Sequence, residues 1–462
     1  MTSASDDQGS FESSRVQNTK ITSISWPDDL AHLHRLNPDR YPALLESTAD
    51  QNPLGRYDIL FAFPQGRLTL NSEGRLSGHC SNSDQLFLEA LDQWWELEKS
   101  LPVQSSLPFT GGWFVLLGYE LANQIEPGLN LQTDANYPVA MAVRCPAAII
   151  RDRQKQCAWI VTEDGCDEYE QLILKDLVLA EAAPLSSTET LLSGSLTEED
   201  PVNFLNAVKR TKAHIAAGDI FQANLSRQWT AELSAETTPV DLYERLRKAN
   251  PAPFAGLAVF DRFAVIGSSP ERLLRIKEGF AETRPIAGTH PRENGEAPPS
   301  GLLDNPKERA EHIMVIDLER NDLGRVSAPG SVTVNEFMVI ESYSHVHHIV
   351  SNIRGRQLPG TTPGQTIAAL FPGGSITGCP KVRCMEIIHE MEQRPRGLYT
   401  GAMGYINRDG TTDLSILIRT MTMHERKLDI ATGCGIVADS DPEAELAETR
   451  AKAKGLLLAL QS

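Results

Sequence analysis

Two segments of the sequence could each present paired carboxylates on one face of a helix. In NPKERAEHIMVID, Asn305 can cap a helix and Pro306 suits its first turn. Glu308 and Glu311 then lie three residues apart on a common face. Such a pair can bind a divalent cation, but paired glutamates are also common on solvated helix faces. One pair therefore leaves both interpretations open.

The second segment, DPEAELAETRAK, repeats this pattern near the C-terminal end of the sequence. Asp441 can cap a helix that begins at Pro442, and further along the chain one face carries Glu445, Glu448 and Lys452. Two helices that each carry paired carboxylates could meet around Mg²⁺, which prefers oxygen ligands and keeps several water molecules. A solvated acidic face is again the alternative.

Two glycine-rich segments could bring backbone N–H groups close to an anion. FPGGSITGCPK has the glycine spacing of a phosphate-binding loop, but Cys379 follows Gly378 where that loop requires lysine, so NTP binding is disfavoured. The same segment can still lead into a helix whose first N–H groups suit an anion. In ATGCGIV, Gly433 and Gly435 allow backbone amides to approach a carboxylate, with a bulge or tight turn as the alternative.

The stretch TRPIAGTHPR reads as a stiff loop flanked by arginines. Pro285 and Pro291 fix φ and remove two backbone donors, which excludes the middle of a helix and a central strand. Gly288 permits a turn or the close approach of a ligand, and Ala287 contributes only a methyl group. A surface turn is the alternative interpretation.

Three histidines lie close together in SHVHHIVS. In a strand, His345 and His347 would point to one side and His348 to the other. No cysteine or acidic residue stands at a matching spacing, so a zinc site is disfavoured. We expect one buried histidine with an orienting role.

Composition excludes several classes of function. Of the 462 residues, 41% are hydrophobic, which permits a sizeable core, and the net charge is −18. A protein this acidic repels phosphates, so we expect no nucleic-acid partner. No apolar run approaches the roughly 20 residues that span a bilayer, and the polar N-terminal segment lacks the features of a signal peptide, so we expect no membrane partner. Seven scattered cysteines without a C-x-x-C pair indicate a reduced, cytoplasmic protein.

The elements that would position these residues are of mixed type. Residues 1–19 have the composition of a disordered tail, residues 20–185 form an N-terminal region, and residues 196–462 form a second region behind a Ser/Thr-rich linker. The pattern predicts an α+β fold with much antiparallel sheet. The expected elements are a hairpin over 56–70, a helix over 87–99, two strands over 139–164, a helix from Asp200 to Gly218 and a hairpin that turns near Asp261 and Arg262.

Taken together, these motifs resemble those of the chorismate-utilising enzymes. The resemblance extends from about Leu196 to the C-terminus, which it identifies as a chorismate-binding catalytic domain. The first 180 residues match more loosely, through LLES, RYDIL and GGWFVLLGYEL, and are similar to the amine-adding branch of the family, anthranilate synthase and aminodeoxychorismate synthase large subunits. The resemblance implies a composite α+β fold in which two large antiparallel β-sheets pack as a sandwich with helices outside. The motifs are SPERLL, RPIAGTHPR, ERAEHIMVIDLERNDLGRV, SHVHHIVS, FPGGSITGCPKVRCMEII, LYTGAMGY, LSILIRT and GCGIVADSDPEAE.

The resemblance also implies roles for individual residues of this sequence. Glu311 and Glu448 would ligate Mg²⁺, which would hold a substrate carboxylate. Glu308 and Glu445 would be nearby or water-mediated partners of that metal. Glu271, in SPERLL, resembles the general acid that protonates the departing C4 hydroxyl, a task that requires a raised pKa.

Further matching positions would surround the substrate. His348 matches the family histidine near the leaving group. Tyr399 and Arg419 match the residues that hold the enolpyruvyl carboxylate, and an arginine can bind a carboxylate through two hydrogen bonds. The remaining matches would act through backbone amides, at Gly433 and Gly435, or through lesser substrate contacts, at Thr377 and Lys452.

Position 287 bears on which member of the family this chain resembles. Water-adding members, and many aminodeoxychorismate synthases, have lysine here, whereas alanine is usual in anthranilate synthases, where ammonia attacks C2. Ala287 therefore disfavours isochorismate and salicylate synthesis. Asn224 and the triplet Gly374-Ser375-Ile376 instead resemble aminodeoxychorismate synthases. We therefore expect amination of chorismate to 4-amino-4-deoxychorismate, a step toward 4-aminobenzoate and folate. Anthranilate formation, in tryptophan biosynthesis, is the alternative.

Further expectations concern partners, regulation and the loss of activity. The sequence contains no glutaminase nucleophile, which would need a spacing such as G-x-C-x-G before a helix, so ammonia would come from a glutamine amidotransferase subunit. LLES, which ends at Ser47, resembles the element that contacts tryptophan in this branch, with a buried strand end as the alternative. A non-catalytic relative is disfavoured because the polar site residues are all present.

Overall fold

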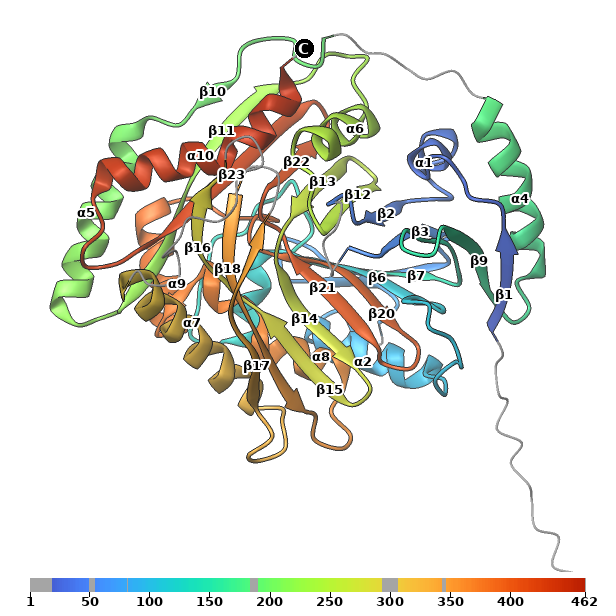
Figure 1. Ribbon diagram of the computed structural model, residues 1–462, viewed down its shortest axis with the longest axis horizontal. Helices are drawn as coiled ribbons and strands as arrows, with labels where there is room; N and C mark the ends of the chain where they lie inside the picture. The colour runs from blue at the N-terminus through green and yellow to red at the C-terminus, as the bar shows by residue number, and fades with distance from the viewer. Residues whose placement is uncertain are drawn as a thin grey trace, which may run out of the picture.

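The computed structural model describes residues 19–49, 55–80, 82–182, 190–292, 306–342 and 346–461; within these ranges the side chains of residues 287, 289–291, 306–308 and 346 are not described. The tail expected at residues 1–19 therefore lies outside the described residues, except for Thr19. Neighbouring strands with a defined register are antiparallel, and they form two large sheets (Figure 1).

The first sheet has 12 strands and contains segments from both halves of the sequence. Its edge strands are β1 (Thr19–Ile24) and β10 (Thr197–Glu198). Between them lie, in order, β9 (Cys157–Glu163), β8 (Ala147–Asp152), β3 (Tyr57–Ala62), β2 (Ala43–Glu46), β12 (Phe254–Phe260), β13 (Phe263–Ser269), β22 (Thr420–His424), β23 (Lys427–Ile436) and β11 (Gln222–Glu232), while β19 (Gly378–Cys379) pairs with β11.

The second sheet has 11 strands and is equally mixed. Its order begins at β16 (Ile286–Pro291) and ends at β5 (Leu76–Gly78). Between them lie β18 (Val346–Arg356), β15 (Phe280–Arg284), β14 (Arg272–Lys277), β21 (Thr412–Ile416), β20 (Ala402–Asn407), β6 (Gly112–Leu117), β7 (Ala140–Cys145) and β4 (Gly66–Leu70), while β17 (Thr333–Ser342) pairs with β18.

Three large apolar clusters show how these layers pack. One cluster joins the two sheets, because it contains Phe61 and Val265 from the first sheet and Phe114 and Met403 from the second. A second cluster lies between the second sheet and helices α2 (Phe87–Glu98) and α8 (Pro363–Leu370). A third lies between the first sheet and the helices on its other face. The α+β sandwich with helices outside, implied by the resemblance, is therefore confirmed.

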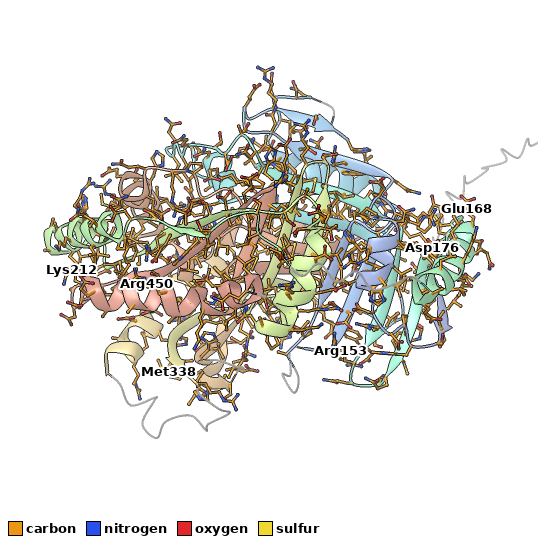
Figure 2. All side chains as sticks on the ribbon, turned by 90° about the horizontal axis from the view of Figure 1, so that it is seen from above. Arg153, Glu168, Asp176, Lys212, Met338 and Arg450 are labelled. Atoms are coloured by element: carbon orange, nitrogen blue, oxygen red, sulfur yellow. The ribbon has the colours of Figure 1, made fainter. Side chains whose placement is uncertain are left out.

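The remaining helices cover the outer faces and the ends of the sheets. Helix α10 lies along β23, and α7 lies beside β16 and β18 (Figure 1). Figure 2 shows α5, which carries Lys212, at the opposite end of the molecule from α4, which carries Glu168 and Asp176. None of the helices in the described ranges is long and apolar enough to cross a membrane. Besides α2 and α8, the helices are α1 (Ala31–Leu36), α3 (Ala122–Ile125), α4 (Asp167–Ala182), α5 (Pro201–Ala217), α6 (Pro239–Ala249), α7 (Pro306–Gly324), α9 (Lys381–Glu392) and α10 (Pro442–Leu460), with 3₁₀ turns η1 (Tyr119–Leu121) and η3 (Gly374–Ile376).

Locally encoded elements agree with the sequence analysis. The helix expected over 87–99 is α2. Helix α5 begins where the Asp200 side chain accepts a hydrogen bond from the Val202 amide and ends at Gly218, whose φ is 82°. The hairpin at Asp261 joins β12 to β13.

One expectation about strand pairing was wrong, and another was incomplete. The segment 56–70 is not a hairpin, because β3 pairs with β2 and β8 in one sheet whereas β4 pairs with β5 and β7 in the other. The segment 139–164 does contain two antiparallel strands about a charged turn, β8 and β9, but a third strand, β7, precedes them. The chain passes from the second sheet to the first at Pro146, between β7 and β8. In both segments, two strands that follow one another in the chain therefore lie in different sheets.

Candidate active site

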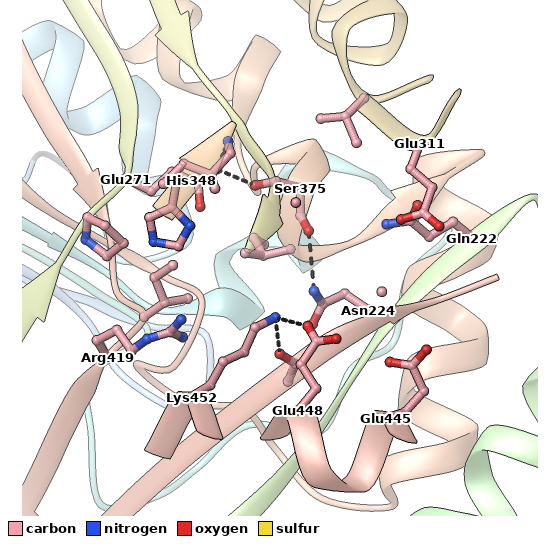
Figure 3. A pocket seen from close by; sticks show the side chains of 18 of the residues that line it. Gln222, Asn224, Glu271, Glu311, His348, Ser375, Arg419, Glu445, Glu448 and Lys452 are labelled. Carbon is pink, nitrogen blue, oxygen red and sulfur yellow. Dashed lines mark hydrogen bonds and ion pairs between the residues drawn. The ribbon is translucent and has the colours of Figure 1, made fainter. Parts of the chain in front are cut away.

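A cavity of about 300 Å³ opens where strands of both sheets meet α7, α10 and η3. It gathers most of the residues that the sequence analysis selected. Figure 3 shows Glu271, His348 and Arg419 on one side, and Glu311, Glu445 and Glu448 on the other. The lining residues are Gln222, Asn224, Pro270, Glu271, Ile286, Gly288, Glu311, Val315, His348, Ser375, Ile376, Tyr399, Ile418, Arg419, Gly433, Gly435, Glu445, Glu448 and Lys452.

Glu271 lies between β13 and β14 and is 3% exposed. Its Oε1 accepts hydrogen bonds from Ser375 Oγ at 2.7 Å and from the Ile286 amide at 3.0 Å. Burial raises the pKa of the Glu271 carboxyl to about 7, although both hydrogen bonds act in the opposite direction. A carboxyl with such a pKa can hold a proton near neutral pH and give it to a leaving group.

His348 projects from β18 into the cavity, and its neighbour His347 projects from the opposite face of the strand. The His347 ring is hydrogen-bonded to Ser342 Oγ at 2.8 Å, away from the cavity. Burial lowers the pKa of His348 to about 3, and a hydrogen bond with the Gly288 backbone acts in the opposite direction. His348 is therefore a neutral imidazole at physiological pH. His345, the third histidine of the motif, lies outside the described residues.

The acidic side of the cavity is built by two helices. Helix α7 contributes Glu311, and α10, capped by Asp441 as expected, contributes Glu445 and Glu448. The side chain of Glu308 lies outside the described part of the chain. Carboxylate oxygens from two helices are the donors that Mg²⁺ prefers. Their oxygens do not all lie within 4.8 Å of one another.

Lys452 projects toward the same carboxylates. Its Nζ lies 2.7 Å from Glu448 Oε1 and donates to the Gly433 carbonyl at 3.0 Å (Figure 3). The spacing of Glu448 and Lys452 on one helix face was predicted from the sequence, and the structure confirms it. An ammonium group here neutralises part of the negative charge and remains able to contact an anionic substrate.

Gly433 and Gly435 have a packing role that sequence reasoning missed. They lie on β23 opposite Ser226 and Asn224 of β11. A Cβ atom at Gly433 would lie 2.5 Å from the Leu225 carbonyl oxygen, and one at Gly435 would lie 2.5 Å from Gln222 Nε2. These glycines therefore let the two strands and the side chains of β11 approach closely.

Tyr399 and Arg419 both line the cavity, as the resemblance implied. Tyr399 is 7% exposed, and burial raises the pKa of its phenol to about 12, so it remains a neutral donor. Arg419 has φ of 51°, a left-handed conformation that costs a non-glycine residue about 1–3 kcal/mol. The Ser268 amide holds this backbone by donating to the Arg419 carbonyl at 3.0 Å. Strained backbone conformations of this kind are concentrated at binding sites.

Several lining residues were not selected as site residues. Gln222 and Asn224 lie two positions apart on β11 and therefore point to the same side of the strand. Gln222 Oε1 and Asn224 Oδ1 are buried without a hydrogen-bond partner within the described residues. Ser375 and Asn224 had been noted only as marks of one branch of the family. The alternation of polar and apolar residues in Gln222-Ala223-Asn224 was the signal in the sequence that could have identified Gln222 and Asn224 as site residues.

Three predicted positions are not part of this cavity as described. Thr377 lies behind its wall, because it is buried and its Oγ1 donates to the Gly373 carbonyl at 2.9 Å. The backbone of Ala287 lies in β16 between two lining residues, but its side chain lies outside the described part of the structure. Ser47 lies near a second cavity of about 100 Å³ that is lined by its neighbours Leu45 and Glu46. Tryptophan binding there stays a prediction.

One further group of possible metal ligands lies outside the cavity. Asp29, His32 and Glu244 place one ligand atom each within 4.8 Å of the others. Arg247 forms an ion pair with Asp29, and Arg35 forms one with Glu244 at 3.1 Å. Existing arginine partners therefore already neutralise these carboxylates.

Comparisons with known proteins show the family to which the chain belongs. A family model described as chorismate binding enzyme matches residues 41–458. The chain is 40% identical to an anthranilate synthase component I-like protein of Synechocystis sp., over 90% of this chain and 86% of that protein. It is 37% identical to aminodeoxychorismate synthase component 1 of Bacillus subtilis, over 91% and 92%. The crystal structure of anthranilate synthase component I from Streptococcus pneumoniae superposes with a TM-score of 0.77 at 32% identity, over 88% of this chain and 93% of that one. This chain therefore belongs to the chorismate-binding enzyme family.

Proposed function

We propose that this chain aminates chorismate to 4-amino-4-deoxychorismate, in the presence of Mg²⁺, with ammonia supplied by a glutamine amidotransferase subunit. One observation carries the choice of product. Asn224 and Ser375, the residues that resemble aminodeoxychorismate synthases, are joined by a hydrogen bond from Asn224 Nδ2 to the Ser375 carbonyl at 3.3 Å. Ser375 in turn donates to Glu271. The branch-marking residues therefore adjoin the proposed proton donor.

The proton chemistry follows from the environment of Glu271. In the overall exchange, the C4–O bond of chorismate breaks, the hydroxyl leaves as water with the proton of Glu271, and ammonia forms the new C–N bond and loses a proton. Neutral His348 lies on the same side of the cavity, where it can hydrogen-bond the leaving hydroxyl without adding a charge. Without a lysine at position 287, ammonia itself makes the first attack, or C4 is aminated without a covalent enzyme adduct.

Other groups around the cavity would bind the carboxylates of the substrate. Arg419, Tyr399 and the amides of Gly433 and Gly435 provide donors for the enolpyruvyl carboxylate. Mg²⁺, bound by Glu311 and Glu448 with Glu308 and Glu445 as partners, would supply positive charge that holds a carboxylate of chorismate. The chain itself contributes the ammonium of Lys452 beside Glu448.

The properties of the cysteines support an external source of ammonia. Seven free cysteines are scattered over the chain. Burial raises the pKa of the Cys145 thiol to about 12 and also raises that of Cys434, the opposite of an activated nucleophile. The curated relatives named component 1 are consistent with a second subunit that hydrolyses glutamine.

Anthranilate formation is the second candidate, because Ala287 and the similarity to anthranilate synthases favour it. Both products are tested by one assay, in which the purified chain is incubated with chorismate, Mg²⁺ and an ammonium salt. Anthranilate is detected by its fluorescence, and 4-amino-4-deoxychorismate after a lyase converts it to 4-aminobenzoate. We expect 4-aminobenzoate in the coupled assay. Absence of chorismate consumption at every ammonium concentration would refute both candidates, and a fluorescent product with inhibition by micromolar tryptophan would establish the second.

A further inference from the structure

Arg396 lies behind the cavity and contacts three of its walls, although it does not line the cavity itself. Its Nη2 donates to the Asn224 carbonyl at 2.6 Å, and its Nη1 donates to the Ile376 carbonyl at 3.0 Å. Its guanidinium carbon lies 5.8 Å from the centre of the Tyr399 ring. Asn224 belongs to β11, Ile376 to η3, and Tyr399 to the segment between α9 and β20. One side chain therefore joins three separate elements that shape the site.

Other contacts fix the guanidinium itself from several directions. Glu392 accepts hydrogen bonds from Nη2 at 2.7 Å and from Nε at 3.1 Å. The Ser226 amide and hydroxyl both donate to Glu392 Oε1, at 2.8 and 2.9 Å. The Tyr119 ring lies 4.8 Å from the guanidinium carbon, and the Arg396 amide donates to Glu120 Oε1 at 2.7 Å. Arg396 is 5% exposed, so this arrangement is shielded from water.

The contacts of Arg396 continue to the proposed proton donor. Asn224, whose carbonyl Arg396 binds, donates through its side chain to the Ser375 carbonyl, and Ser375 donates to Glu271. Ile376, the other carbonyl partner, is the residue after Ser375. Arg396 therefore constrains the position of Ser375 in two ways. It binds Asn224, which bonds to the Ser375 carbonyl, and it binds Ile376, the next residue in the chain.

We propose that Arg396 is a positioning residue of this site. It fixes the positions of β11, η3 and Tyr399 relative to one another, and so aligns Glu271 with the residues that hold the enolpyruvyl carboxylate. The inference rests on the proposed function for its kinetic effects, but its structural effect stands apart from the product. A lysine cannot replace Arg396, because a single ammonium lacks the planar fork that binds two carbonyls and a carboxylate together. Its loss would leave buried carbonyls of Asn224 and Ile376 without their donor.

The chain offers a matched control in Arg227. This arginine is also fully buried, and it lies on β11 next to Ser226. It binds Glu198 Oε1 and the Glu199 carbonyl, each at 2.5 Å, and lies 5.0 Å from the Trp229 ring centre. None of these partners lines the cavity. R227K therefore removes a comparable buried fork whose partners do not line the cavity.

The test compares the wild type, R396K, R227K and the milder E392Q by steady-state kinetics with chorismate, Mg²⁺ and ammonium, and by thermal denaturation. We expect R396K and R227K to lower the unfolding temperature similarly. We expect R396K alone to lower kcat/KM by about 100-fold, with changes in both kcat and KM, because small displacements of catalytic groups have effects of this size. E392Q should show a smaller loss in the same direction. Equal kcat/KM for R396K and R227K would overturn the inference.

Hydrogen exchange separates this inference from the proposed function, because it requires no turnover. In R396K, amides of residues 222–226, 374–377 and 397–400 should exchange roughly tenfold faster than in the wild type, reflecting local loosening. In R227K, these segments should be unchanged. Should R396K fail to fold, amide exchange in E392Q is compared with exchange in R227K and the wild type instead. Unchanged exchange in all three segments would overturn the positioning role, whatever reaction the wild type catalyses.

Discussion

Ser375 donates a hydrogen bond of 2.7 Å to Glu271, the buried carboxyl at the end of the cavity opposite the paired glutamates. This contact opposes the effect of burial on the pKa of Glu271, because a hydroxyl donor stabilises the carboxylate. The protonation of Glu271 thus depends on Ser375 as well as on burial.

The variant S375A should raise the pKa of Glu271. Loss of a hydrogen bond to a charged group costs about 1.5 kcal/mol, which corresponds to a pKa change of about one unit. The falling limb of the kcat/KM profile, measured between pH 6 and pH 9, should therefore move to higher pH. Ser331 does not line the cavity, and its Oγ donates to the Ala328 carbonyl, so it supplies the control S331A, which should leave the profile in place. An unmoved limb in S375A would show that this bond does not tune Glu271.

The activity of the wild type should fall as the pH rises through about 7. Glu271 must carry a proton to act as an acid, and its pKa is raised to about 7, so the active form is lost above that value. E271Q cannot donate this proton and should lower kcat by about 10²- to 10⁴-fold, with no remaining dependence on pH in this range. D92N is the control, because burial also raises the pKa of Asp92, to about 6, but Asp92 bonds to Thr362 and Gly364 outside the cavity. A normal profile in E271Q would exclude Glu271 as the acid.

The acidic side of the cavity should set the affinity for Mg²⁺. E448Q removes one carboxylate of the proposed metal site and should raise the Mg²⁺ concentration for half-maximal activity at least tenfold, equivalent to about 1.4 kcal/mol. Binding of Mg²⁺ alone, measured by calorimetry, should weaken in parallel. Glu443 lies on the same helix and is exposed, so E443Q should behave as the wild type. Equal Mg²⁺ dependence in the two variants would place the metal elsewhere.

Local signals in the sequence predicted the helices and their functional faces well. Asp441 caps α10 as expected, and the spacing of Glu445, Glu448 and Lys452 brings all three into the cavity, because a helix face depends only on residues a few positions apart. Strand pairing depends on residues far apart in the sequence, which is why the hairpin expected over 56–70 does not exist.

Other parts of the site had no local signal. The hydrogen-bond partners of Glu271 lie on β16 and η3, 15 and 104 positions further along the chain, so only the family motif identified this residue. Arg396 is a single arginine whose partners lie on β11, η3 and α9, and no periodic pattern marks it. The role of Gly433 and Gly435 in packing against β11 appears only once the register of the two strands is known.

That register leads to different expectations for two neighbouring glycines. In G433A, the new methyl group would lie 2.5 Å from the Leu225 carbonyl oxygen, so the backbone of β11 must move, at a cost of about 1–3 kcal/mol in the free energy of unfolding. In G435A, the nearest atom belongs to the Gln222 side chain, which can rotate away. G435A should therefore unfold near the wild-type temperature yet lose activity, because Gln222 lines the cavity. Thermal denaturation and kcat/KM measured on both variants distinguish the two effects. Equal destabilisation of G433A and G435A would mean that the β11–β23 contact does not have the described register.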